Sequence, residues 1–277
     1  MIESGVTTAV DLGPWRSAVN WGFAQAELGR PARGWDVHQA MEEWAAEQRA
    51  LSTRQRMVRE PTTARYVQRI VSLGLRASGV RLLRIAVLLV LALFGMRAAT
   101  VGGCQPGDAR FVRSGAFVFK FRCVKKWPAL REHPQDRVRE CPADPEHPRA
   151  QVLRVLRRAY RADRDFVCTC LRQEMPRVRM SHEQLLRRLE TGAATQITRW
   201  MRELVPQPDQ YGVRMVGGSV LASHSWRIMF SSACEAVPYA AERVQRDAFW
   251  RAAESRAPYI RPFAYSQYLA LLYDHLA

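Results

Sequence analysis

The sequence predicts an α+β fold that is mainly helical and contains one small antiparallel β-hairpin sheet. Three observations lead to this prediction. The stretch from Val80 to Ala99 is apolar on every face, as expected of a helix enclosed by the rest of a domain. Phenylalanine then recurs at every second position from Phe117 through Phe121, which is the period of a strand. From 148 to 206 the apolar residues return at helical spacing.

The N-terminal part, residues 1–58, is predicted to be a short helical segment. Its four tryptophans lie among the helix-forming residues Ala, Glu and Gln: Trp15, Trp21, Trp35 and Trp44. A domain boundary is placed near residue 58, because a threonine at a helix-capping position then precedes an amphipathic run from Tyr66 to Leu75. With 277 residues, 48% of them apolar, the chain can bury one good core in 59–277 and at most a small second domain.

After the central helix, the elements follow in a clear order. Gly102 to Gly107 predicts a turn before the strand at Phe117 to Phe121, and Arg137 to Arg139 predicts a partner strand. The next helix has an apolar side and an arginine-rich side, the latter carrying Arg154, Arg157, Arg158 and Arg161. The aromatic pattern from Phe263 to Tyr273 predicts a C-terminal helix that packs on the body of the protein or on a neighbouring protomer.

The charge balance favours a polyanionic partner. The chain has 42 basic and 26 acidic side chains, a net charge of +16 and a pI near 10.5, which point most simply to nucleic acid. Eight arginines lie between Arg54 and Arg84 with Glu60 as the single acid, so this stretch is either a solvated helix face or a phosphate-binding surface. We find no glycine-rich phosphate loop and no carboxylate cluster, so neither a nucleotide nor a metal cofactor is predicted.

The lack of a secretory signal and the distribution of the cysteines predict an intracellular protein, nuclear in a eukaryote and otherwise cytoplasmic. The first thirteen residues lack a basic region followed by an apolar core, so a secretory signal is not expected. The strongest apolar run, Ile85 to Met96, is shorter than the roughly twenty residues a membrane helix needs, which favours a buried core helix and no membrane partner. The six cysteines are scattered, as structural thiols in a reducing compartment would be.

The distribution of lysine singles out one segment. The chain has three lysines, Lys120, Lys125 and Lys126, against 39 arginines. Arginine cannot replace a proton donor, because its pKa exceeds about 12, whereas the pKa of a lysine can be lowered towards neutrality. A lysine that donates a proton would therefore be retained. A hairpin tip that merely contacts phosphate is the alternative, and Lys120 is the weakest candidate because it lies within the predicted strand.

Four residues near the C-terminus form a second pattern. His224 and Arg227 are three apart, so at the start of a helix they share a face and can reach one phosphate. Trp250 follows 23 residues after Arg227, and Tyr259 lies nine residues further on, between two prolines that disfavour a continuous helix. Tyr239, Tyr265, Tyr268 and Tyr273 compete with Tyr259, and the last three are interpreted as structural because they follow an aromatic, apolar pattern.

Taken in order, these residues resemble the tyrosine recombinase (phage integrase) family over about residues 60–265. Phe94-Gly95-Met96-Arg97 is similar to the family's first arginine motif. The resemblance implies that Arg97 and Arg227 bind the phosphate and that Lys125, with Lys126 as the alternative, protonates the leaving oxygen. It implies that His224 assists proton movement, that Trp250 occupies the His or Trp position, and that Tyr259 is the nucleophile.

The resemblance further implies cleavage and rejoining of double-stranded DNA through a covalent 3′-phosphotyrosine, by a homotetramer on DNA and without a metal. A mobile element is the implied source, and residues 1–58 would be a shortened DNA-clamping domain. The chain departs from the family pattern at Thr100, where an acid is usual, and in the segment that follows Arg227. A catalytically inactive, DNA-binding relic is therefore the alternative, and a basic RNA-binding or assembly protein is a third hypothesis.

Overall fold

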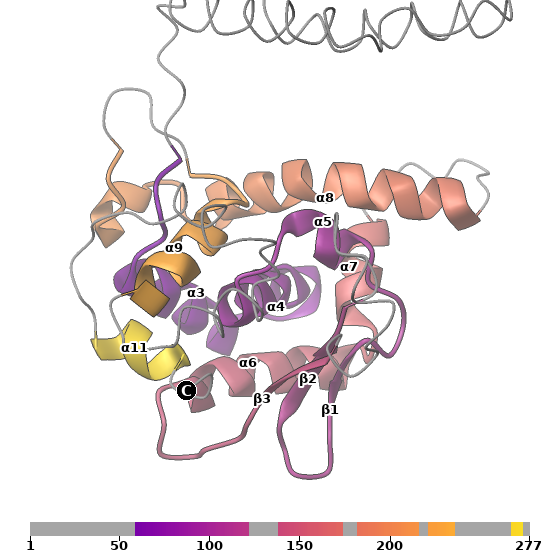
Figure 1. Cartoon of the computed structure of the whole chain (residues 1–277), viewed down its shortest axis with the longest axis horizontal. Helices are drawn as coiled ribbons and strands as arrows, with labels where there is room; N and C mark the ends of the chain where they lie inside the picture. The colour runs from indigo at the N-terminus through magenta and orange to yellow at the C-terminus, as the bar shows by residue number, and fades with distance from the viewer. Residues whose placement is uncertain (1–58, 122–137, 174–181, 216–220, 236–266, 274–277) are drawn as a thin grey trace, which may run out of the picture. The chain divides into compact units, whose positions relative to one another are not determined.

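The computed structural model describes residues 59–121, 138–173, 182–215, 221–235 and 267–273. The chain divides into two compact units, Met1–Arg56 and Met57–Ala277, and every described residue belongs to the second. This unit is mainly helical with one three-stranded antiparallel sheet (Figure 1). The prediction of a mainly helical α+β fold agrees with this arrangement.

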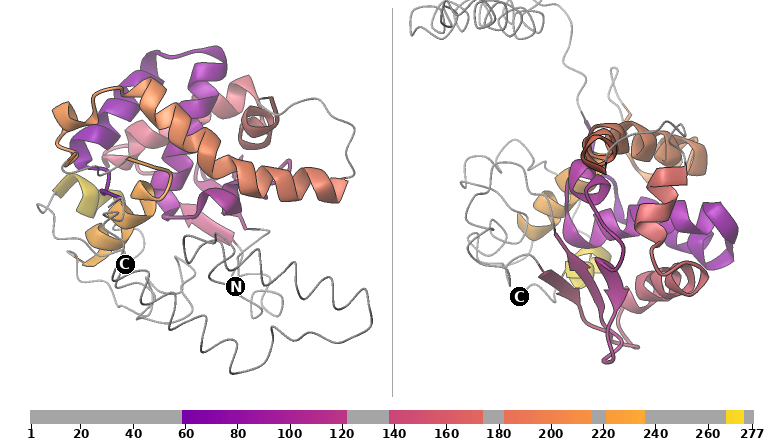
Figure 2. Two further views of the ribbon diagram at one scale, coloured as in Figure 1. Left: turned by 90° about the horizontal axis from the view of Figure 1, so that it is seen from above. Right: turned by 90° about the vertical axis from the view of Figure 1, so that its right-hand side faces the viewer.

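The core is built around α4, Gly79–Phe94, whose residues from Ile85 to Phe94 are all buried. Helices contact it from several sides, so the apolar faces of α4 all meet protein (Figure 1). In both views of Figure 2, α8 runs along the outside of the unit. The helices that pack on α4 are α3 (Ala64–Arg76), α6 (Arg149–Ala162), α7 (Phe166–Gln173), α8 (His182–Leu204) and α9 (Ser225–Glu235). The central buried helix is thus confirmed.

The predicted extent of this helix, to Ala99, is wrong. Helix α4 ends at Phe94, because Gly95 adopts the left-handed conformation (φ 56°, ψ 24°) and its N–H donates to the Leu91 carbonyl as a C-cap. A short helix, α5 (Ala98–Gly102), then begins, with Arg97 as its N-cap in extended conformation. Arg97 therefore lies in the break between two helices and not at the end of one.

The sheet has the order β1-β2-β3, with strands Ala109–Phe111, Phe117–Lys120 and Val138–Cys141. The expected pairing of the second and third strands is present, with Lys120 opposite Val138. Strand β1 was not predicted, since three residues are too few to show a period. Val118 is as buried as its phenylalanine neighbours, so the alternation does not leave one open face on β2. Phe94 packs on three phenylalanines of the sheet region, Phe117, Phe119 and Phe121.

Both ends of α3 are capped by side chains. Thr63 accepts a hydrogen bond from the N–H of Tyr66, which confirms the predicted threonine cap at the start of the helix. At the other end, Arg158 of α6 donates to the carbonyl of Gly74 at 2.7 Å and to that of Ala77 at 2.9 Å. Arg158 is thus a structural arginine that fastens α6 to the end of α3.

The C-terminal helix α11, Gln267–Tyr273, packs on the body of the unit, as one of the two predicted alternatives stated. The Tyr273 hydroxyl donates to the Ala92 carbonyl of α4 at 2.6 Å, and its ring meets Phe230 of α9 edge-on. Five cysteines in the described part of the chain are buried free thiols. Among the helices that the structure describes, none has the length and apolar character to cross a membrane.

Candidate active site

The predicted helix at His224 begins one residue later, as α9. The carbonyl of His224 accepts hydrogen bonds from the N–H groups of Arg227 and Ile228, which makes His224 the residue that opens the helix. The Ser225 hydroxyl accepts from the Ala222 N–H and fixes the turn just before it. This geometry places His224 and Arg227 one helical turn apart, on the same side of the start of α9.

Arg227 is joined directly to the segment that carries Arg97. Its Nη1 donates to the carbonyl of Gly95 at 2.9 Å, two residues before Arg97. Arg227 is 1% exposed, whereas Arg97 is half-buried. The bond therefore brings the end of α4 and the start of α9 together, although these elements are separated by about half of the chain.

The same junction depends on Gly95. A Cβ at this position would lie 2.3 Å from a ring carbon of Phe230 on α9, and its φ of 56° disfavours any L side chain. Gly95→Ala is expected to lower the free energy of unfolding by about 2–4 kcal/mol, the sum of left-handed strain and overpacking. Urea unfolding measured by circular dichroism tests this prediction.

Gly79→Ala is the matched control. Gly79 has nearly the same φ, 55°, but a Cβ there would meet nothing within 4 Å. This variant should lose only the strain, about 1 kcal/mol. Equal losses in the two variants would contradict a tight contact between Gly95 and Phe230.

His224 lies in a strongly cationic environment. Burial lowers its pKa to about 4, and the charges of Arg59, Arg227 and Arg97 contribute in that order. The structure thus brings Arg97, His224 and Arg227 into one electrostatic cluster. At pH 7 His224 is therefore neutral.

Arg59 is a member of this cluster that sequence reasoning did not single out. It is exposed and precedes Thr62, whose N–H donates to the Ser225 carbonyl at 3.4 Å and whose hydroxyl donates to the Met229 sulfur at 2.9 Å. These two bonds hold the segment before α3 against the start of α9. In the sequence Arg59 is one of the eight arginines between Arg54 and Arg84, and its spacing does not distinguish it from the others.

Arg59→Ala is expected to raise the pKa of His224 from about 4 towards its ordinary value, because a positive charge that disfavours the imidazolium is removed. NMR titration of the histidine side chains measures this shift. Arg65→Ala is the control, since Arg65 is also exposed, on the first turn of α3, and is not among the charges that act on His224. An unchanged titration in Arg59→Ala, or an equal shift in Arg65→Ala, would contradict the placement of Arg59.

The remaining predicted residues, Lys125, Lys126, Trp250 and Tyr259, lie outside the described residues. Lys120 is described: it ends β2, and its N–H donates to the Asp108 carbonyl at 2.8 Å. In the sequence, Lys125 and Lys126 lie between β2 and β3. Lys120 at the end of β2 pairs with Val138 at the start of β3.

Two of the competing tyrosines are poor nucleophiles in this fold. Burial raises the pKa of Tyr268 to about 12, which disfavours the phenolate. Tyr273 is fully buried, and its hydroxyl is engaged by Ala92. Their interpretation as structural residues agrees with these contacts.

No family model and no curated protein matches this chain. Among solved structures, the chain is similar to one titled "Crystal structure of XerA recombinase", with a TM-score of 0.44 and 15% sequence identity. The match covers 92% of this chain and 79% of that chain.

Proposed function

We propose that this protein cleaves and rejoins double-stranded DNA, with Tyr259 as the nucleophile and a 3′-phosphotyrosine intermediate. The observation that supports the proposal is the convergence of Arg97, His224 and Arg227 at the junction of α4 and α9. Two arginines and a histidine at one point form a site for a phosphodiester. The resemblance noted in the sequence requires the same three residue types in the same chain order.

The chemistry follows from the residue types. The Tyr259 oxygen forms a bond to phosphorus, the bond from phosphorus to the 5′ oxygen breaks, and Lys125 or Lys126 gives that oxygen a proton. Arg97 and Arg227 stabilise the negative charge that builds up on the non-bridging oxygens. A neutral His224 can accept the proton that the Tyr259 phenol loses, and a phosphate beside it would raise the pKa of His224 because the anion favours the imidazolium.

Access to the site differs among its cations. Arg59 is exposed, Arg97 is half-buried and Arg227 is 1% exposed in the DNA-free chain. A phosphate would therefore meet Arg59 and Arg97 first, and DNA binding must uncover Arg227 before both clamping arginines can hold the same phosphate. In this proposal the buried Arg227 sets the geometry of the reacting phosphate, and the exposed Arg59 attracts the phosphate to the site.

The test is a nicked suicide duplex, in which the short 5′-hydroxyl strand diffuses away after cleavage and traps the covalent complex. A DNA adduct that survives SDS supports the proposal. Binding of DNA with no adduct on any duplex would support the inactive, DNA-binding relic instead. Because the target sequence is unknown, random-sequence duplexes with one nick provide the substrate pool.

A further inference from the structure

A second basic surface lies beside α6 and shares no residue with the candidate active site. It is an open groove of about 580 Å³ between the β1–β2 turn and α6. None of the described residues that line it is acidic, and three of them are arginines. We call it the α6 groove, and its lining residues are Phe111, Val112, Arg113, Ser114, Gly115, Ala143, Arg157, Tyr160 and Arg161.

The strand register places the groove and the C-terminal end of β2 at opposite ends of the sheet. The β1–β2 turn joins Phe111 to Phe117, at one end of the sheet. The lysine-bearing segment leaves β2 after Lys120, at the other end. No residue of the groove belongs to the predicted catalytic set.

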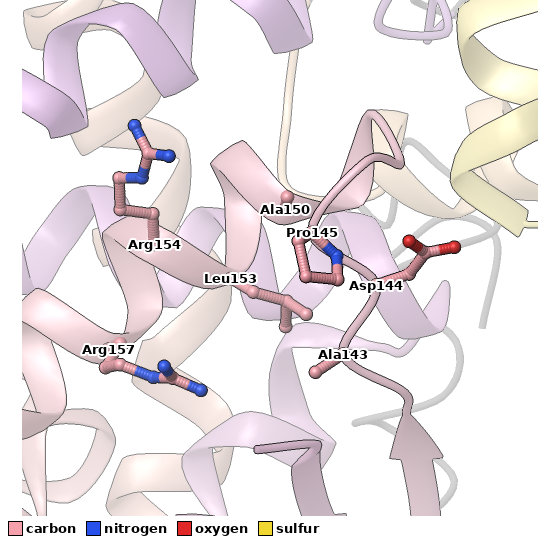
Figure 3. A pocket seen from close by; sticks show the side chains of 7 residues that line it. All are labelled: Ala143, Asp144, Pro145, Ala150, Leu153, Arg154 and Arg157. Atoms are coloured by element: carbon pink, nitrogen blue, oxygen red, sulfur yellow. The ribbon is translucent and has the colours of Figure 1, made fainter. Parts of the chain in front are cut away.

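A neighbouring hollow extends the basic surface along α6. It shares Ala143 and Arg157 with the groove and adds Arg154 (Figure 3). In Figure 3 the guanidinium groups of Arg154 and Arg157 lie on one side and the Asp144 carboxylate lies on the other, pointing away from them. Within the described part of the chain, no carboxylate forms an ion pair with Arg113, Arg154 or Arg161.

Arg157 is held in place by the protein. Its Nη2 donates to the Gly115 carbonyl at 3.1 Å, and its guanidinium lies 5.0 Å from the centre of the Phe111 ring. Gly115 permits this approach, since a Cβ there would be 3.1 Å from that nitrogen. A fixed guanidinium loses little side-chain entropy when it binds an anion.

The spacing of the arginines fits a chain of phosphates. Arg154, Arg157 and Arg161 follow one another at three and four residues on α6, all exposed. From Arg154 to Arg161 the helix rises about 10 Å, which is about the axial rise of three nucleotides of one DNA strand. A row of cations along one helix suits the row of phosphates along a nucleic-acid strand better than it suits a single small anion.

We propose that the α6 groove, with Arg154 beside it, binds the phosphodiester backbone of DNA as a second contact surface. The net charge of +16 already favours a polyanion. The groove adds what a general positive charge lacks, namely a fixed arginine, a row of exposed arginines along one helix and no acidic residue in its own lining. The proposal shares with the proposed function only the identity of the ligand, and its test requires no strand cleavage.

The experiment compares two variants of the full chain, each with three arginines replaced by alanine. Both also carry Tyr259→Phe, so that DNA binding is measured without strand cleavage. The groove variant is R113A/R154A/R161A, which spares Arg157 and its contacts. The control variant is R199A/R202A/R214A, three exposed arginines that lie outside the groove and outside the arginine-rich stretch from Arg54 to Arg84. The two variants have the same net charge. Fluorescence anisotropy with a labelled duplex gives the dissociation constant over a range of salt concentrations.

The groove variant is expected to bind DNA roughly tenfold more weakly or worse, and its plot of log affinity against log salt should lose about one unit of slope for each arginine that contacts a phosphate. The control variant should stay close to the parent protein. Equal weakening in both variants, or none in either, would overturn the proposal. A groove variant that still binds DNA but no longer binds poly-glutamate would overturn it in favour of an acidic protein partner.

Discussion

Tyr259→Phe is expected to abolish the SDS-resistant adduct on a nicked suicide duplex while DNA binding remains at the wild-type level. The substitution removes one oxygen, the atom that must form the bond to phosphorus, and leaves the aromatic ring in place. Without this nucleophile the covalent bond to DNA cannot form, so the variant should lose the adduct completely. Denaturing gel electrophoresis of a labelled substrate measures the adduct, and anisotropy measures binding.

Tyr268→Phe is the matched control for this experiment. Tyr268 is half-buried on α11, and the raised pKa of its phenol, about 12, makes it a weak nucleophile. The adduct of this variant should therefore form as in the wild type. Full adduct formation by Tyr259→Phe would refute the assignment of the nucleophile, and the modified residue could then be identified by mass spectrometry of the DNA-linked peptide.

Arg227→Lys is expected to slow adduct formation by about 10²–10³-fold, the usual loss when one donor to a developing anion is removed. Lysine keeps the positive charge but presents a compact ammonium in place of a planar fork. It cannot hold the Gly95 carbonyl and a non-bridging oxygen in the geometry that a guanidinium allows. Single-turnover adduct formation at saturating DNA measures this effect separately from binding.

Two controls separate chemistry from folding in this variant. Arg202→Lys on the exposed side of α8 should react at the wild-type rate. The pKa of His224 should stay low in Arg227→Lys, because the charge beside it is retained. A rate equal to that of the wild type, with the protein folded, would exclude Arg227 as a phosphate clamp.

Gly95 illustrates what local sequence patterns miss. The apolar run from Val80 predicts a helix correctly, but it continues smoothly past the true end, because Met96, Ala98 and Ala99 are good helix residues. The helix stops because Gly95 takes the left-handed conformation, and the Phe230 ring of α9 leaves no room for a side chain at this position. That contact joins residues far apart in the chain, so no window of sequence around Gly95 contains it.

Arg59 and the α6 groove show the same limitation for charge. The sequence shows many arginines and their net sign, but it treats them as equivalent. In the fold, Arg158 caps α3, Arg157 stacks on Phe111, Arg227 is buried against Gly95, and Arg59 acts on His224. Each role follows from which groups lie beside the guanidinium in space.

Most of the larger elements and the order of the candidate residues could be predicted from the sequence, because helix period, strand period, capping and net charge are local or additive properties of the chain. These patterns predicted the buried helix, a threonine cap at the start of the helix before it, the paired strands and a helix that begins near His224. The tertiary structure was needed to place Arg97, His224 and Arg227 in one cationic cluster with Arg59, and to show that arginines of α6 border a groove. Such contacts arise from the packing of α4 against α9 and of α6 against the sheet, and packing depends on residues that are distant in the chain.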